Sequence, residues 1–151
     1  LRRQHAFRLR VVADVAPELP DLDVQFVPWR LDRQEHDLRE CDLGLMPLSA
    51  DPFAAGKAAY KLLQYLSLAM PAVASAVGMN RDVAGERQEH CLLAASPDEF
   101  AEQCRRLLAD ENLRRELGRR GRALITAEYC RERIAQRLAE TLLRAARLKS
   151  R

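Results

Sequence analysis

The sequence predicts an α/β fold in which helices cover both faces of a parallel sheet and an all-helical C-terminal segment follows. Two observations lead to this prediction. Between residues 7 and 95, short apolar and β-branched runs alternate with helical patterns, as in sheets built from βαβ units. From Pro97 onward the pattern is helical throughout. The 151 residues are enough for one compact domain with one hydrophobic core.

Five segments are predicted to be strands because they are short and largely apolar, and the first two of them are also rich in β-branched residues. They are Phe7–Ala13, Asp23–Val27, Asp42–Leu48, Ala72–Ala76 and Cys91–Ala95. The patterns between them predict a helix at Leu31–Glu40, a second at Lys57–Ala69 and a helical turn at Arg81–Ala84. The second helix must end at Met70, because Pro71 cannot continue it.

The C-terminal segment divides into three helices. Ser96 is a suitable N-cap for the first of them, with Pro97 in its first turn and Glu99 at the capping-box position. Breaks near Asp110–Asn112 and Ala127–Tyr129 separate the three. All predicted strands therefore precede this segment.

Composition and charge favour a globular protein and argue against several other classes. Hydrophobic residues make up 48% and charged residues 31% of the chain, and no apolar run is long enough to span a bilayer. The start, LRRQHAFRLRVVAD, lacks the apolar core of a signal peptide. It resembles the end of a helix that runs into a strand, so the chain is expected to be a fragment of a longer protein.

The cysteines, histidines and arginines indicate no metal, redox or nucleic-acid site. The four cysteines lack C-x-x-C spacing and histidine partners, and are expected to be reduced thiols of a cytoplasmic protein. The three histidines are expected at the surface. Arginines interleaved with glutamates crowd the last third, as on a solvated helical face. Without stacking aromatics, nucleic acid is not an expected partner. Peripheral contact with anionic lipids at the inner face of the membrane is a second interpretation of this pattern.

The segment Gly56–Gly78 carries the strongest functional signal. Gly56 and Lys57 open the predicted helix, Lys61 follows one turn later, and Gln64 lies on the same face. Alone, such a face would be typical of a solvated amphipathic helix. A strand precedes this helix and a glycine turn follows it, which favours a different interpretation. Free N–H groups at a helix start, joined to two lysines, form an anion site that most often binds phosphate.

The run from Cys41 to Gly78 resembles the donor-binding core of family 4 glycosyltransferases of the GT-B fold. Those enzymes carry a Gly-Lys opening and then K-L-x-[EQ]-Y-M-A-x-G-x-P-V-V-A-S and a glycine. The matching positions are Lys61, Leu62, Gln64, Tyr65, Pro71, Val73, Ala74, Ser75 and Gly78. Pro28-Trp29 and the stretch Ala109–Tyr129 resemble the flanks of the same family, so the resemblance covers nearly the whole chain.

The resemblance implies that residues 1–151 are the Rossmann-like C-terminal domain of a retaining hexosyltransferase, which binds a nucleotide sugar. The donor would be linked to UDP or GDP, with no metal or other cofactor. The N-terminal acceptor domain, the first strand of this domain and two basic phosphate ligands would precede residue 1. The acceptor would be a sugar or a lipid-linked glycan in polysaccharide or cell-envelope synthesis. The isolated chain is therefore not expected to catalyse transfer.

The strand Phe7–Ala13 is expected to lie inside the sheet, and absence of the first strand beside it implies an unpaired edge. Such an edge is a template for pairing with another chain. It is expected either to form a dimer or to be covered by Leu1–Ala6 or by the C-terminal helix.

Nine residues are expected to bind the donor, and none is assigned a catalytic role. They are Trp29, Asp51, Phe53, Gly56, Lys57, Ala58, Ala59, Lys61 and Gln64. The N–H groups of Lys57–Ala59 and both lysines would stabilise the departing diphosphate, and Gln64 would accept from the ribose hydroxyls. Asp51 either contacts sugar hydroxyls or starts the turn of the loop Ser49–Phe53. Trp29, the only tryptophan, either stacks on the base or packs beside the pocket, and the second is favoured.

Three positions depart from the family pattern. Many members hold glutamates where this chain has Gly56 and Gln64. Gly56 offers no side chain, so sugar recognition must come from the backbone or from elsewhere. Gln64 keeps a carbonyl acceptor but loses the charge that strengthens such hydrogen bonds. Ala69 stands where glycine is common, which implies a mild change in helix packing.

Two alternatives stay open. The chain could be half of another GT-B enzyme, such as a nucleotide-sugar epimerase or a phosphorylase. An epimerase would need acid–base carboxylates and histidines in the pocket, and a phosphorylase a cofactor lysine. Alternatively, it is a non-catalytic Rossmann-like module that assembles through its arginine-rich helices.

Overall fold

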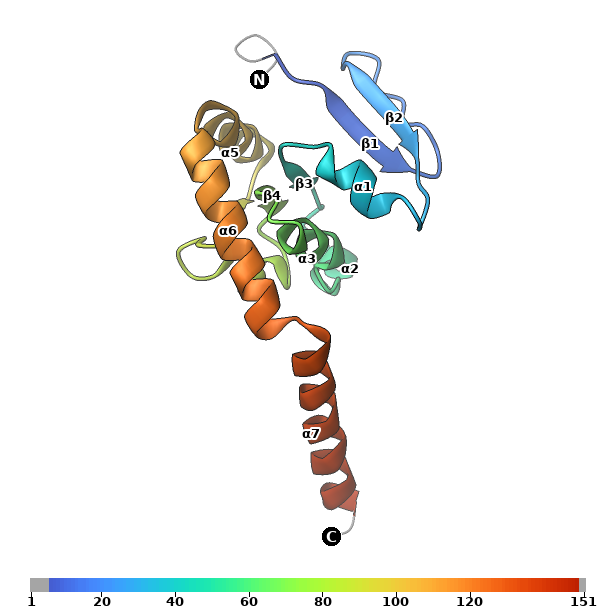
Figure 1. Cartoon of the computed structure of the whole chain (residues 1–151), viewed down its shortest axis with the longest axis vertical. Helices are drawn as coiled ribbons and strands as arrows, with labels where there is room; N and C mark the ends of the chain where they lie inside the picture. The colour runs from blue at the N-terminus through green and yellow to red at the C-terminus, as the bar shows by residue number, and fades with distance from the viewer. Residues whose placement is uncertain (1–5, 150–151) are drawn as a thin grey trace.

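The computed structural model describes residues 6–149, in which strands and helices are mixed up to Ala94 and only helices follow (Figure 1). The strands are β1 (Leu9–Ala13), β2 (Val24–Pro28), β3 (Gly44–Met46), β4 (Ala72–Ser75) and β5 (Leu92–Ala94). The helices are α1 (Gln34–Arg39), α2 (Pro52–Ala55), α3 (Tyr60–Ser67), α4 (Asn80–Ala84), α5 (Pro97–Ala109), α6 (Glu111–Glu128) and α7 (Arg131–Lys149). Each predicted strand is present within a few residues of its predicted bounds, and the predicted α/β class with a helical C-terminal segment is confirmed.

The strands form two parallel sheets rather than one. In the first, β1 pairs with β2, with Leu9 opposite Val24 and Ala13 opposite Pro28. In the second, the order is β3–β4–β5. Among the described residues β1 and β3 each pair on one side only, and their other edges line a cleft between the two sheets. The expected unpaired edge is therefore present, but the prediction that Phe7–Ala13 lies inside the sheet is wrong, because among residues 6–149 β1 pairs with β2 alone in a two-stranded sheet.

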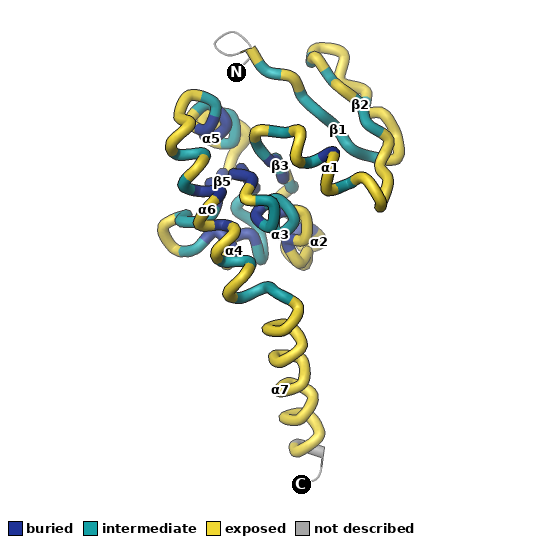
Figure 2. Tube along the Cα trace, viewed as in Figure 1, coloured by how far each residue is buried: buried dark blue, intermediate teal, exposed yellow. Residues whose placement is uncertain are grey.

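The two segments predicted to cover the unpaired edge of β1 have different outcomes. The segment Leu1–His5 lies outside the described residues, so its part in covering the edge stays a prediction. The C-terminal helix does not cover the edge, because α7 runs away from β1 at the opposite end of the molecule (Figure 1). Its whole described surface is exposed, and no part of it enters the core (Figure 2). Pairing of the edge with a second chain stays a prediction.

The three-stranded sheet is buried on both faces by helices. Alternate residues of a strand point to opposite sides. Ala72 and Ala74 of β4 pack in one cluster with Leu62 and Leu66 of α3, while other β4 and α5 side chains meet on the far face. That second cluster is formed by Val73, Leu92, Cys104, Leu107 and Leu117. Helices on both faces of a parallel sheet, as predicted, therefore hold for β3–β5.

Side-chain caps fix the helix boundaries of the C-terminal segment. Ser96 Oγ accepts from the Glu99 N–H at 3.2 Å, as predicted. The Glu99 carboxylate accepts from the Ala95 N–H at 2.6 Å, one residue before the position that a capping box requires. Asp110 ends α5 and caps α6 by accepting from the Leu113 N–H at 2.9 Å. The breaks therefore fall where the sequence predicts them.

The helix predicted to begin at Lys57 begins three residues later. A short helix that the sequence analysis took for a turn, α2, precedes it. The Asp51 carboxylate caps α2, and Gly56 ends it. Ala59 then has a left-handed φ of 52°, and α3 starts at Tyr60. The prediction that Gly56 and Lys57 open the helix is wrong. The N-cap aspartate followed by proline starts an earlier helix, and Lys57–Ala59 form the loop between the two.

A left-handed backbone explains why glycine is common at the position of Ala69. Its φ is 56°, a conformation that costs most L-residues about 1–2 kcal/mol but glycine little. The next layer also approaches this turn closely, since a Cβ on Gly118 of α6 would lie 2.1 Å from the Ala69 carbonyl oxygen. The departure at Ala69 therefore concerns backbone conformation, whereas the sequence analysis expected a change in packing.

None of the helices within residues 6–149 combines the length and the apolar composition that crossing a bilayer requires.

Candidate functional site

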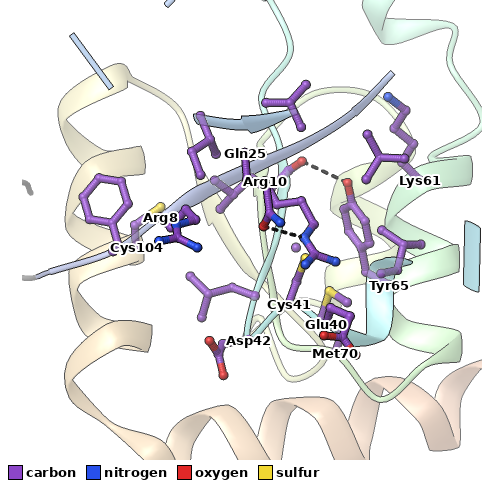
Figure 3. Close-up of a pocket in the computed structure, with 18 of the residues that line it drawn as sticks. Arg8, Arg10, Gln25, Glu40, Cys41, Asp42, Lys61, Tyr65, Met70 and Cys104 are labelled. Carbon is purple, nitrogen blue, oxygen red and sulfur yellow. Dashed lines mark hydrogen bonds between the residues drawn. The ribbon is translucent and has the colours of Figure 1, made fainter. Parts of the chain in front are cut away.

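A cleft of about 1030 Å³ separates the two sheets (Figure 3). We call residues 6–41, with β1, β2 and α1, the N-terminal lobe, and residues 42–128 the C-terminal lobe. Arg8 and Arg10 of β1 line the cleft on one side, and Lys61 and Tyr65 of α3 on the other. Arg10 already has partners in its own lobe, since it donates to the Asp37 carbonyl at 3.0 Å and to the Gln25 side chain at 3.2 Å.

The carboxyl ends of β2 and β3 open onto this cleft, together with α3. In parallel sheets this is the edge at which ligands bind. Trp29 directly follows β2, and Lys61 and Gln64 lie on α3. The structure thus brings three of the nine predicted donor-binding residues to one cleft. The other six do not line it: Asp51, Phe53, Gly56, Lys57, Ala58 and Ala59.

A hydrogen-bonded chain joins the two lobes at this position. The Gln34 side-chain oxygen accepts from Trp29 Nε1 at 3.4 Å and from Gln64 Nε2 at 3.3 Å. Trp29 is 45% exposed, so its ring lies at the edge of the cleft rather than inside the core. An exposed ring at this position leaves both predicted roles, stacking on the base and packing beside the pocket, as predictions.

Lys57 and Lys61 are both exposed near the start of α3. Lys57 lies in the loop before the helix, and Lys61 lies in its first turn. Among the described residues neither Lys57 nor Lys61 forms an ion pair. Lys57 Nζ lies 5.0 Å from the centroid of the Phe53 ring, which is 80% exposed, in a cation–π contact. Tyr60 is exposed as well, so the helix start is not buried under another element. The N–H groups of the first turn belong to Tyr60–Leu62, rather than to Lys57–Ala59 as predicted.

The remaining predicted residues lie outside the cleft, so their part in donor binding stays a prediction. Asp51 starts a helical turn, since its carboxylate accepts from the Ala54 N–H at 2.8 Å. The hydrogen bond from the Ser49 hydroxyl, and then that from Ala54, lower the pKa of Asp51. Ala59 is buried, while Gly56 and Ala58 lie on the exposed surface of the loop.

The two thiols and the phenol that line the cleft stay protonated at neutral pH. Burial raises the pKa of Cys41, and it raises the pKa of Cys104 to about 11. Burial also raises the pKa of Tyr65, whose hydroxyl donates to the Leu45 carbonyl at 3.2 Å. These groups are therefore unsuited to act as a thiolate nucleophile or a general base.

Gln34 is the functional candidate that sequence reasoning missed. It lies 30 residues before Gln64 and starts a short, largely exposed helix. A lone glutamine at a helix start gives no signal of chemistry. Only the approach of α1 and α3 across the cleft brings it to the site.

Comparisons with known proteins agree on one family. The family model described as "Glycosyl transferases group 1" matches residues 1–110. No curated protein matches the chain. Among solved structures, the chain is similar to sucrose-phosphate synthase from Thermosynechococcus elongatus, with TM-score 0.68 and 24% identity over 83% of this chain and 31% of that one. It is also similar to the C-terminal domain of a group 1 glycosyl transferase, LpcC, from Francisella tularensis. There the TM-score is 0.57 and the identity 19%, over 72% of this chain and 55% of that one.

The two structural likenesses show the fold, and the chain spans only about a third and about half of those two chains. The family model, in contrast, matches more than two thirds of this chain and includes every residue that lines the cleft. The chain therefore belongs to the group 1 glycosyl transferases.

Proposed function

We propose that the start of α3, at the edge of the cleft, binds the nucleoside diphosphate part of a nucleotide sugar. This part would be UDP or GDP. The observation that carries the proposal is the pair of exposed lysines without ion-pair partners in the described chain, beside a helix start and an acceptor amide. Anions are stabilised at helix N-termini by free N–H groups and by the helix dipole. Lys57 and Lys61 would add two cations for the diphosphate, and Gln64 would accept from the ribose hydroxyls.

In the whole protein this site would serve retaining transfer of a hexosyl group. Cleavage of the glycosyl–phosphate bond places negative charge on the departing diphosphate, and the lysines with the N–H groups of Tyr60–Leu62 would stabilise that charge without a metal ion. The acceptor, a sugar or a lipid-linked glycan, would bind a domain outside this chain. We also propose that the protein is cytoplasmic and acts in cell-envelope or polysaccharide synthesis. The chain alone would be inactive.

The alternative of an epimerase finds less support in the cleft. Carboxylates line it at Asp23, Glu40 and Asp42, but no histidine does so among the described residues. An acid–base pair of the expected kind is therefore not assembled there.

Titration with nucleotides tests the proposal. In isothermal titration calorimetry the chain should bind UDP or GDP, and the double variant Lys57→Gln/Lys61→Gln should bind it about 10- to 100-fold more weakly. This is the scale for losing at least one charged hydrogen bond of about 1.5–3 kcal/mol. Arg144→Gln on α7 removes a surface cation far from the cleft and should leave the affinity unchanged. Absence of binding by the unmodified chain, or equal binding by the double variant, would contradict the proposal.

A second variant separates ribose recognition from phosphate recognition. Gln64→Ala should weaken binding of UDP or GDP by roughly 1–2 kcal/mol, because an acceptor for ribose hydroxyls is lost. Binding of inorganic diphosphate, measured in the same buffer, should barely change. Equal losses for both ligands would mean that Gln64 acts through the helix rather than on the ribose.

A further inference from the structure

Gln34 connects two residues of the proposed donor site without belonging to any motif. Its side-chain oxygen accepts one hydrogen bond from the indole of Trp29 and one from the amide of Gln64. Trp29 and Gln34 lie in the N-terminal lobe, whereas Gln64 lies across the cleft on α3. The side chain of Gln34 therefore connects Trp29, at the edge of the cleft, to Gln64, the proposed acceptor for the ribose hydroxyls.

The chemistry of the three groups fixes the direction of each hydrogen bond. An indole N–H can only donate, so Trp29 requires that Gln34 present its carbonyl oxygen. That oxygen in turn requires a donor from Gln64, which presents its NH₂ group. If the Gln64 amide were reversed, two carbonyl oxygens would face each other at hydrogen-bond distance. The amide is therefore held with Nε2 toward Gln34 and with Oε1 on the opposite arm.

The proposed function needs that orientation. A ribose hydroxyl can donate to Oε1 of Gln64 but not to its NH₂ group, and no hydrogen bond among the described residues occupies Oε1. We propose that Gln34 is a positioning residue, which holds the Gln64 carbonyl toward the ligand. It thereby favours nucleoside diphosphates over bare diphosphate. The inference rests on the proposed function and adds to it a residue that sets specificity for the nucleoside.

Two substitutions at Gln34 distinguish positioning from simple packing. Gln34→Glu keeps an oxygen acceptor for both donors and should retain the preference for UDP or GDP over inorganic diphosphate, although its added negative charge weakens binding of both ligands. Gln34→Ala removes the acceptor and frees the Gln64 amide, so affinity for the nucleotide should fall about 3- to 10-fold, the range for one lost hydrogen bond. Affinity for inorganic diphosphate should change less than about twofold. Gln136→Ala on the distant α7 is the matched control, with no expected change.

Trp29 gives a readout that does not depend on ligand, because it is the only tryptophan. In the free protein, time-resolved fluorescence anisotropy should show faster indole motion in Gln34→Ala and unchanged motion in Gln34→Glu. Equal nucleotide affinity of Gln34→Ala and the unmodified chain would overturn the positioning role and leave the donor site standing. So would an equal loss for nucleotide and diphosphate. An unmodified chain that binds neither UDP nor GDP would overturn the donor site and this role with it.

Discussion

Gly118→Ala should destabilise the protein by about 2–4 kcal/mol, although alanine is the better helix former. In an exposed helix this substitution stabilises by about 1 kcal/mol. Here the added Cβ would lie 2.1 Å from the Ala69 carbonyl oxygen and 3.0 Å from its carbonyl carbon. Backbone atoms cannot rotate away, so α6 must move off α3 and lose core contacts. Urea unfolding followed by circular dichroism measures the change in the free energy of unfolding.

Gly56→Ala is the matched control for that substitution. Gly56 has a φ of −80°, and its added Cβ would lie at ordinary van der Waals distance from the carbonyl oxygens of Phe53, at 3.6 Å, and Pro52, at 3.8 Å. The variant should be as stable as the unmodified chain or more stable by a few tenths of a kcal/mol. A Gly118→Ala variant with unchanged stability would show that α6 does not pack on the end of α3 as described.

Leu66→Ala should cost about 3–5 kcal/mol of the free energy of unfolding. Leu66 is fully buried between the sheet and α6, where a Cβ on Gly121 would come within 2.6 Å of its Cδ2 atom. The substitution removes buried methyl groups and leaves a cavity. The sheet and α6 cannot move together enough to fill it. Thermal or urea unfolding should therefore show a large loss at this position.

Leu138→Ala makes the same chemical change on another helix. Leu138 of α7 is 57% exposed, and α7 leaves the body of the protein. Its substitution should change stability by no more than about 0.5 kcal/mol. A similar loss for both variants would mean that α7 folds back on the core, contrary to the structure.

Local signals predicted the elements, because strand composition and helix caps act over a few residues. β4 shows this well. Ala72, Val73 and Ala74 are apolar and fully buried, as expected of a strand covered on both faces, and the predicted cap at Ser96 forms. The error at Lys57 was also local. Asp51-Pro52 is a helix start and Gly56 is typical of a helix end, so the true boundaries could have been predicted from the sequence.

The candidate site depended on contacts that no local pattern contains. Lys61 and Gln64 could be predicted, because helical spacing places them on one face. Their partner across the cleft could not, since Gln34 reaches Gln64 through the relative placement of α1 and α3. Periodicity likewise cannot say whether parallel strands form one sheet or two. That depends on which edges meet in three dimensions.

The cleft between the sheets divides the molecule into parts of unequal stability. Apart from Asp37, every buried residue in the described chain lies at or after Gly44, while β1 is only half-buried throughout. The N-terminal lobe therefore has little apolar burial of its own and should open in partial unfolding events that leave the C-terminal lobe folded. Trp29 and Gln34 belong to the weaker part. Loss of the assembled site is then governed by the free energy of this local opening, which is smaller than that of global unfolding. A ligand that bridges the cleft and binds only the closed form would raise both quantities by the same amount, and would therefore raise the smaller one by the larger fraction.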